Sequence, residues 1–507
     1  MPGAQQPASG DVGSIPIHQL SAREYDNTAR DLLGTRLKPG VGFQSFEAAG
    51  FDTLAAAGVM NSRKVTGYFD AASSLAEELF ADPTRRAGVV TCQPAAGNDT
   101  SCAESIIKAF GLRAFRRPLE PTEVADLVSR CQAALGLGLA HEGALQHVVR
   151  IMLTSPQFIY RIEFDPDPAS VHLLTGHEVA SRLSYLVWSS MPDALLLAAA
   201  DSGELKSSDA LAATVDRMLA DPRSRELVDN FAAQWLGARR LDDHVVDPAV
   251  YPAWTPALGV AMQQEMAAYF DDFLHGDQTY DKFLTSNVNF VDSGLAALYG
   301  LPDPGSAALT RVQNTSGQRT GFMGLAGFLT HTSRMDRTAP SIRGKWIVNS
   351  LKCMELELPP NLTPPPLGEP AAGQTVRQVL EAHRANPSCA GCHTMMDRIG
   401  FSLEHLDAAG RYRETENSYP IDDSGSVTGT SKGDLKVTGP AELATTISQL
   451  PEVTDCVSSY LGGYALGLNH DSAACLVSNA ASELRSGGSL LDFYVHIARS
   501  EHFRSRQ

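Results

Sequence analysis

Five consecutive residues, Cys389-Ala390-Gly391-Cys392-His393, constrain this chain more than any other feature. The pattern C-x-x-C-H is the attachment site for a c-type haem, in which two thiols add to the vinyl groups and become thioethers. The adjacent histidine binds the iron through an imidazole nitrogen. With 8 Cys and 14 His in 507 residues, chance predicts roughly 0.003 such matches. The motif therefore predicts one covalently attached haem c.

Two other chemistries use the same cysteine spacing. A redox-active C-x-x-C pair cycles between dithiol and disulfide, and a zinc site combines one such pair with a second pair of ligands. The chain has no second C-x-x-C, and no H-x₃₋₅-H follows the motif at finger spacing. Zinc is therefore the weaker of these alternatives.

Length and charge limit the class of protein and its partners. A chain of 507 residues exceeds one hydrophobic core, so about two to five domains are expected. The formal net charge of −17 argues against nucleic acid or an anionic membrane as partner, because both attract clustered Lys and Arg. It is compatible with a basic redox partner protein. No run of about eighteen apolar residues occurs, so we expect no transmembrane segment, and the oligomeric state is not indicated.

The first residues, Met1 to Gln6, lack the charged and apolar regions of a signal peptide. Haem is nevertheless attached to C-x-x-C-H outside the bacterial cytoplasm, so the motif predicts an exported protein. We interpret the chain as a mature or engineered form, with residues 1–15 as a flexible linker left after removal of a signal or lipid anchor. The expected location is periplasmic or extracellular.

Six cysteines remain beside the haem pair. Cys92 and Cys102 flank a loop-like segment, Cys456 and Cys475 lie near each other, and both pairs are expected to form local disulfides in an oxidising compartment. Cys131 and Cys353 are then left over. Six cysteines allow 15 connectivities, and free buried thiols are the alternative.

The apolar pattern is mainly helical. Ser21-Ala22-Arg23-Glu24 is a capping box that opens a helix, residues 71–81 predict a second, short helix, and alternating Thr, Ser and Gly runs over residues 411–438 predict a small β-hairpin. We expect a mainly α fold, with several small helical domains in series and a C-terminal cytochrome c-like haem module that contains the hairpin. After the linker, the expected domains are an N-terminal helical domain (16–90), a helical domain with a cysteine loop (91–164), a helical domain (170–300), the haem c module (320–415) and a C-terminal helical domain (416–507).

Six strings occur in an order that resembles one family. They run from Leu20 to Gly34, Ala114 to Leu119, Ser155 to Arg161, Arg182 to Trp188, Arg343 to Ile347 and Ser388 to Asp407. Together they resemble the planctomycete and myxobacterial family of secreted c-type cytochrome-like proteins, built from five consecutive domains of unknown function with a C-terminal C-x-x-C-H module. The resemblance covers nearly the whole chain and implies export, a single haem c and extracytoplasmic redox chemistry. One departure is Arg398, where family members often have proline.

The sixth ligand of the iron decides the chemistry, because a Met or His there gives an electron carrier and an open position gives ligand binding or peroxidase-like activity. Met395 and Met396 follow His393 too closely to reach the other haem face, and no methionine occurs after them. We therefore expect a protein ligand, if there is one, from residues 330–338, with Met335 ahead of His331. An open iron is the alternative.

Three arginines near the motif are candidate partners of the haem propionates: Arg398, Arg411 and Arg413. Charge-assisted hydrogen bonds from a guanidinium suit a carboxylate. The alternative for each is an ordinary solvated surface side chain.

The sequence supports three hypotheses for function. The first is an extracytoplasmic monohaem c-type cytochrome-like redox protein that transfers single electrons. The second is a haem-dependent oxidoreductase, peroxidase- or oxygenase-like, with an open distal site. The third is a secreted scaffold that uses haem as a staple. No G-x-S-x-G, H-E-x-x-H, phosphate-binding or dinucleotide-binding pattern occurs, so no catalytic residue is assigned.

Overall fold

The computed structural model describes residues 17–95, 100–164, 170–276, 278–356, 373–474 and 476–506. Within these ranges the chain forms 23 α-helices, and each of its sheets has two strands. This confirms the predicted mainly α fold class. Residues 1–15, predicted to be a linker, lie outside the described residues.

The chain divides into two compact units, which we describe separately. Unit 1 comprises residues 1–230, 462–472 and 495–507, and unit 2 comprises residues 231–461 and 473–494. No helix in the described part of the chain is long and apolar enough to cross a membrane.

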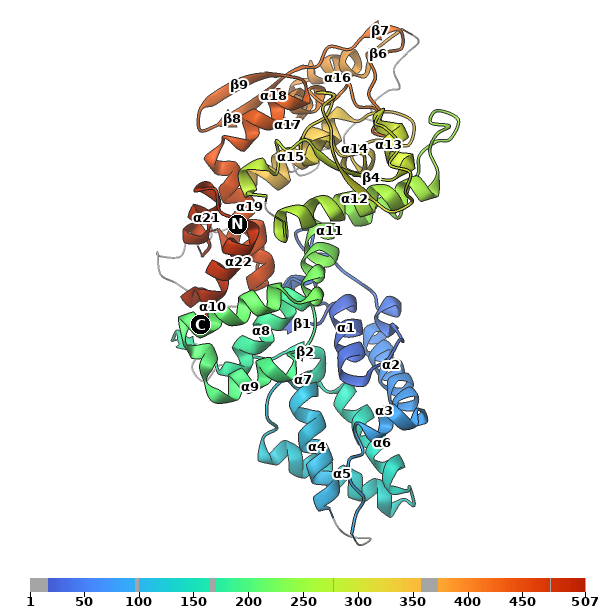
Figure 1. Cartoon of the computed structure of the whole chain (residues 1–507), viewed down its shortest axis with the longest axis vertical. Coiled ribbons are helices and arrows are strands. Elements are labelled where there is room, and N and C mark those ends of the chain that lie inside the picture. Colours follow the sequence, from blue (N-terminus) through green and yellow to red (C-terminus); the bar gives the residue numbers. More distant parts are fainter. Residues whose placement is uncertain are drawn as a thin grey trace. The chain divides into compact units, whose positions relative to one another are not determined.

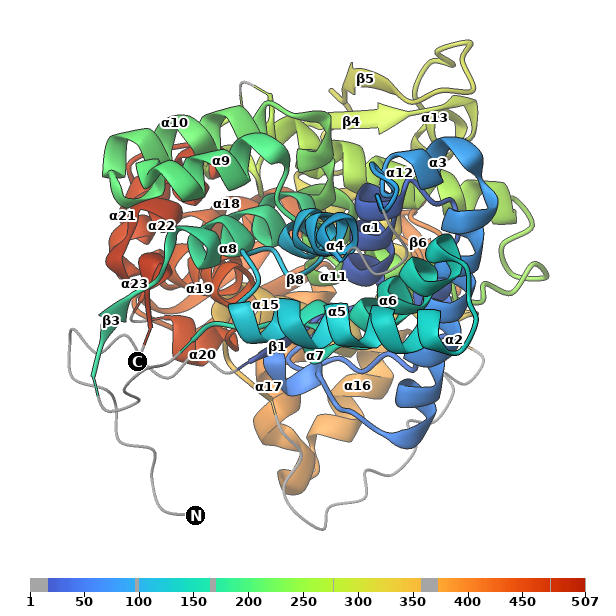
Figure 2. The same cartoon turned by 90° about the horizontal axis from the view of Figure 1, so that it is seen from below.

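Unit 1 is a set of helices with two minimal sheets, in which α9 lies along α8 (Figure 2). Its elements are β1 (His18–Gln19), α1 (Ala22–Leu33), η1 (Pro39–Gly42), η2 (Ala55–Ala57), α2 (Ser62–Ala81), α3 (Pro83–Ala87), α4 (Ser101–Ala114), α5 (Pro121–Gly136), α6 (His141–Thr154), α7 (Pro156–Ile159), β2 (Tyr160–Arg161), β3 (His172–Leu173), α8 (Gly176–Trp188), α9 (Ala194–Ser202), η3 (Glu204–Lys206), α10 (Ser208–Leu219), η4 (Pro222–Arg225), α23 (Glu501–Arg504) and β10 (Ser505–Arg506). The boundary between the two units falls within four further elements: η5 (Leu227–Ala232), α19 (Pro451–Leu466), α20 (His470–Ala473) and α22 (Leu490–Arg499).

The N-terminal helix of unit 1 forms as its sequence predicts. The Ser21 hydroxyl accepts from the Glu24 amide, and the Glu24 carboxylate accepts from the Ser21 amide, so the first turn of α1 is capped on both sides. The helix then buries Tyr25, whose ring packs against Phe43 and Phe158 at centroid distances of 5.0 and 5.5 Å. Capping and one aromatic anchor together fix α1 on the helical core.

Unit 2 contains α17, which carries the C-x-x-C-H motif, and the β8–β9 hairpin, the longest one in the described part of the chain (Figure 1). Its elements are α11 (Ala233–Trp235), η6 (Ala238–Leu241), α12 (Pro256–Leu274), η7 (Tyr280–Lys282), β4 (Val288–Val291), α13 (Ser293–Tyr299), β5 (Thr310–Gln313), η8 (Phe322–Gly324), α14 (Ala326–His331), α15 (Pro340–Lys352), α16 (Val376–Arg384), α17 (Pro387–Phe401), β6 (Thr415–Glu416), β7 (Tyr419–Pro420), β8 (Ser424–Thr430), β9 (Gly433–Thr438), α18 (Gly439–Ser448) and α21 (Ser478–Arg485). The antiparallel pair β8–β9 confirms the predicted β-hairpin.

Helices α15 and α17 pack with their backbones almost in contact. A Cβ atom added at Gly344 would lie 1.7 Å from the Met396 carbonyl oxygen, and one added at Gly400 would lie 2.0 Å from the Pro340 carbonyl oxygen. Only glycine fits at both positions, and each lies opposite the other helix. The pairing of residue 344 with 396 and of 340 with 400 shows that the two helices run antiparallel.

A buried carboxyl group, Glu265 of α12, lies in a polar cluster of unit 2. The Tyr299 hydroxyl donates to Glu265 over 2.5 Å, the Asn289 amide donates to it over 3.0 Å, and the Arg319 guanidinium stacks 3.7 Å from the Tyr299 ring centroid. Burial raises the pKa of Glu265 to about 7, since these partners only partly offset the lost hydration.

Two disulfides are present among the described residues. Cys92 bonds to Cys102, which confirms that prediction. Cys456 bonds to Cys353, so the predicted Cys456–Cys475 pair is wrong; Cys475 itself lies outside the described residues. The fold brings the Cα atoms of Cys353 and Cys456 to 5.4 Å across 103 residues of sequence, and this proximity decides the pairing.

Candidate functional site

The three residues of the haem motif share one face of α17. Asn386 caps the helix by accepting from the Ser388 amide, and Pro387 occupies the first turn. Side chains at positions i, i+3 and i+4 of a helix are neighbours, so Cys389, Cys392 and His393 project together. The helix therefore presents two thiols and an imidazole side by side.

Both motif thiols are free. Cys389 is buried and Cys392 is partly buried, and neither forms a disulfide, although four other cysteines do. In the part of the chain that the structure describes, no compact cluster of three His, Cys, Asp or Glu ligands forms around these thiols. This arrangement does not support the zinc alternative and leaves both sulfurs available for thioether bonds.

The His393 imidazole is held by a buried carboxylate. Its Nδ1 atom lies 3.0 Å from both carboxylate oxygens of Asp397, one helical turn further along α17. Asp397 is fully buried, and Ser341 of α15 donates a 2.6 Å hydrogen bond to its Oδ1. Since a carboxylate only accepts, Nδ1 carries the proton and Nε2 keeps a lone pair that could bind a metal ion. The donor set thus fits a c-type haem.

A second imidazole lies beside the motif. The ring of His383 on α16 is 4.7 Å from the ring of His393 in an edge-on arrangement, because α16 and α17 lie side by side (Figures 1 and 2). Burial, and then the neighbouring His393, lower the pKa of His383. His383 is therefore disposed to be neutral at the motif.

Of the two candidate distal ligands, His331 lies in a packed interior. It ends α14, with its ring 5.7 Å from the Phe328 ring and against Gly237, where an added Cβ would lie 2.7 Å from the imidazole. Burial and then the Arg240 charge lower the pKa of His331 to about 3. Its imidazole is therefore neutral and wedged against η6.

Met335 is half-exposed, and its carbonyl oxygen accepts from the Asp247 amide over 2.8 Å. These contacts direct residues 330–338, which form the end of α14 and the loop that follows it, toward residues 237–247.

The loop 330–338 is anchored at the end of α17 that lies away from the motif. The Thr338 hydroxyl donates to Glu404 over 2.7 Å, and the fully buried Arg343 donates to Ser333 and to the Leu403 carbonyl. Phe401, the last residue of α17, is eight residues from His393, or roughly 12 Å along the axis. These contacts do not favour a sixth ligand from this segment, and a ligand from Met335 or His331 stays a prediction.

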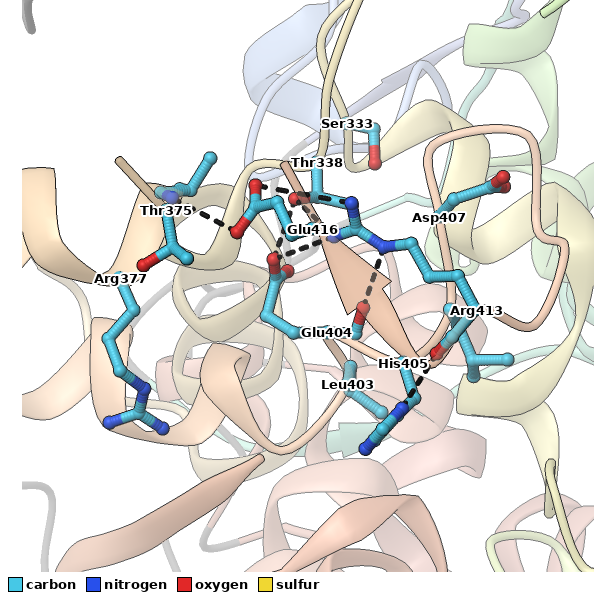
Figure 3. Close-up of polar contacts among 12 residues, drawn as sticks. Ser333, Thr338, Thr375, Arg377, Leu403, Glu404, His405, Asp407, Arg413 and Glu416 are labelled. Atoms are coloured by element: carbon cyan, nitrogen blue, oxygen red, sulfur yellow. Dashed lines mark hydrogen bonds and ion pairs between the residues drawn. The ribbon is translucent and has the colours of Figure 1, made fainter. Parts of the chain in front are cut away.

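Two of the three candidate propionate partners already bind carboxylates. Arg413 donates to Glu404 over 3.2 Å, and its carbonyl oxygen faces His405 Nδ1 at 2.7 Å (Figure 3). Arg411 pairs with Asp407 over 3.3 Å. Arg398, in contrast, is exposed on α17. Arg413 and Arg411 thus have structural partners that would compete with a propionate.

Asp397, Ser341 and His383 lie at the site although no motif in the sequence assigned them a role there. The sequence alone could have indicated the contact of Asp397 with His393, because a His and an Asp four residues apart on a helix are neighbours. No local sequence pattern indicates Ser341 or His383, since the packing of α15 and α16 against α17 brings them to the site.

Four regions of the chain match families that are described as proteins of unknown function. From the N-terminus these are PSD3 (DUF1587) at residues 18–81, PSD5 (DUF1595) at 102–163, PSD4 (DUF1592) at 174–301 and PSCyt3 (DUF1588) at 319–416. The matches confirm consecutive domains of unknown function, four where the resemblance implied five. The C-x-x-C-H motif falls in the PSCyt3 region. No curated protein and no solved structure gives a significant match.

Proposed function

We propose that this chain is an extracytoplasmic monohaem c-type cytochrome-like redox protein that transfers single electrons. The observation that carries the proposal is one face of α17, on which two free thiols lie beside His393. Because His393 Nδ1 contacts Asp397, the Nε2 atom of the same ring would be the one that binds a metal. Cys389 and Cys392 would hold the haem as thioethers, and the bound haem would supply a one-electron iron couple. The name of the matching PSCyt3 family supports a cytochrome-like role.

An extracytoplasmic location is part of the proposal. The Cys92–Cys102 and Cys353–Cys456 disulfides support it, because such bonds persist in oxidising compartments and are rare in the cytosol. The net charge of −17 supports a basic redox partner, since complementary charge steers encounter.

A haem-dependent oxidoreductase with an open distal site is the second candidate. It is favoured by one observation, the anchoring of loop 330–338 near Glu404 rather than near the motif. An iron without a protein ligand on its distal face would bind small molecules rather than only pass electrons.

Covalent attachment is tested by extracting the purified, coloured protein with acidified acetone. The colour should stay with the polypeptide, and a Cys389→Ala/Cys392→Ala variant should lose it. Cys131→Ala is the matched control, because Cys131 is also a free buried thiol but lies in α5. Colour that moves into the solvent, or that survives in the double variant, would contradict the haem c proposal.

The carrier and the enzyme are separated by the ferric protein's reaction with cyanide. A carrier with a thioether ligand shows a weak far-red band and binds cyanide slowly, and Met335→Ala should then remove the band. A wild-type protein that lacks the band and binds cyanide rapidly would favour the oxidoreductase, and peroxidase or oxygenase assays would follow.

A further inference from the structure

We propose that Asp397 is a positioning residue that fixes the Nδ1 proton of His393 and lowers the reduction potential of the haem iron. This inference rests on the proposed haem c site. It adds a residue to that site whose effect on the iron is electronic and can be measured without any substrate.

The contact between the two residues is close and symmetrical. Both carboxylate oxygens of Asp397 lie 3.0 Å from His393 Nδ1, and the pair is spaced i to i+4 on one regular helix. Asp397 is fully buried, whereas the His393 side chain keeps 14% of its surface exposed. The histidine therefore has one nitrogen bound inside the protein, while its Nε2 has no hydrogen-bond partner within the part of the chain that the structure describes.

A buried carboxylate needs hydrogen-bond donors, because losing its hydration without them costs several kcal/mol. Asp397 has two such donors, His393 Nδ1 and the Ser341 hydroxyl at 2.6 Å. Among the described residues, removing the imidazole contact would leave the carboxylate with the Ser341 hydroxyl as its one hydrogen-bond donor. The burial of Asp397 thus favours the tautomer in which His393 Nδ1 is protonated.

The packing of α15 on α17 fixes this geometry. Gly344 and Gly400 bring the two backbones into contact on either side of Asp397, and Ser341 lies in the same interface. The carboxylate can therefore not rotate away from His393 without breaking its bond to Ser341.

The electronic effect follows from the direction of the hydrogen bond. A metal-bound imidazole whose other N–H donates to a carboxylate gains basicity and donates more charge to the metal. More donation stabilises the ferric over the ferrous state, which lowers the potential. The Ser341 donor acts in the opposite sense, because it withdraws charge from the carboxylate.

The experiment is redox titration of covalently haem-loaded protein, with wild type compared with Asp397→Asn and Ser341→Ala. Asp397→Asn should raise the ferrous-to-ferric ratio at a fixed applied potential at least tenfold, which is about 59 mV for one electron. Ser341→Ala should shift the potential in the opposite direction. Glu381→Gln is the control, because it removes one negative charge from an exposed position on the neighbouring helix α16 and should leave the potential unchanged.

Resonance Raman spectra of the ferrous proteins give a second measurement. The iron–imidazole stretching frequency should fall in Asp397→Asn, because the imidazole becomes a weaker donor. A purely structural Asp397 would change the stability but neither the potential nor this frequency, and that result would overturn the inference. If Asp397→Asn does not fold, Ser341→Ala decides, and an unchanged or raised potential would count against the inference. Absence of covalent haem from the wild type would instead refute the proposed function.

Discussion

Replacement of Gly344 by alanine should destabilise unit 2 and disturb the His393 site together. The added Cβ would lie 1.7 Å from the Met396 carbonyl oxygen, whereas ordinary carbon–oxygen contacts begin near about 3.3 Å. The obstacle is backbone rather than a flexible side chain, so α15 and α17 must separate by roughly 1.5 Å. Such a shift would break the 2.6 Å hydrogen bond between Ser341 and Asp397.

Three contributions set the size of the effect. Forcing extra volume into a packed interface costs about 1–3 kcal/mol. Loss of a buried hydrogen bond to a charged group costs about 1.5–3 kcal/mol. The higher helix propensity of alanine returns up to about 1 kcal/mol. We therefore expect Gly344→Ala to lower the free energy of unfolding of unit 2 by about 1.5–6 kcal/mol.

Urea unfolding, followed by tryptophan fluorescence and circular dichroism, measures this change. Gly391→Ala is the matched control in α17, because a Cβ at Gly391 meets nothing within 4 Å. The control should be neutral or slightly stabilising, since alanine is the better helix former. If Gly344→Ala were as stable as Gly391→Ala, the close packing of α15 on α17 would be refuted, and with it the argument that this packing holds Asp397.

Two further results are expected from unit 2 and one from unit 1. Replacing Cys353 and Cys456 by alanine should lower the free energy of unfolding, measured with urea, by about 4.7 kcal/mol, the value of the chain-entropy model for a loop of this size. Replacing Cys92 and Cys102, which close a shorter loop, should lower it by about 3 kcal/mol. Equal losses would contradict the argument from loop length. The pKa of Glu265 is raised from 4.5 to about 7 in the folded state. Its contribution of about 3 kcal/mol to the free energy of unfolding is therefore complete below about pH 4.5 and is lost as the pH rises through about 7. Stability measured from pH 4.5 to 8 should fall over this window in the wild type and stay level in Glu265→Gln, whereas parallel profiles would show that Glu265 is not the group responsible.

Local signals in the sequence predicted the helices well where capping and burial agree. The Ser21–Glu24 capping box acts within one turn of the chain, so it can be recognised in the sequence without knowledge of the fold. The helix predicted at residues 71–81 is in fact α2, Ser62–Ala81. Gly67 weakens the propensity of its first half, yet a Cβ there would lie 3.2 Å from the Phe43 ring, so close packing against that ring outweighs propensity.

Some residues of the candidate site could be predicted from the sequence, and others could not. The residues that act within α17 follow from sequence spacing, because i, i+3 and i+4 positions meet on a helix whatever surrounds it. Ser341 and the Cys353–Cys456 bond depend on packing across 56 and 103 residues of sequence, which no local pattern encodes. The wrong Cys456–Cys475 pair resulted from the assumption that near cysteines pair, whereas the fold sets which Cα atoms approach within disulfide distance.

The anchoring of α17 bears on which redox chemistry the chain supports. Gly344 and Arg343 hold the helix from α15, so the His393 side of the site is built by protein contacts alone. In the proposed haem site, His393 would be the iron ligand that is held in this way. A carboxylate partner on that ligand lowers the potential, whereas a thioether on the opposite face would raise it. Because the Met335 carbonyl oxygen accepts from the Asp247 amide, the proposed haem site would lack this thioether and would have the lower potential. For the proposed haem site, a low potential in the wild type would indicate a carrier that works among low-potential partners, whereas rapid cyanide binding would favour the oxidoreductase.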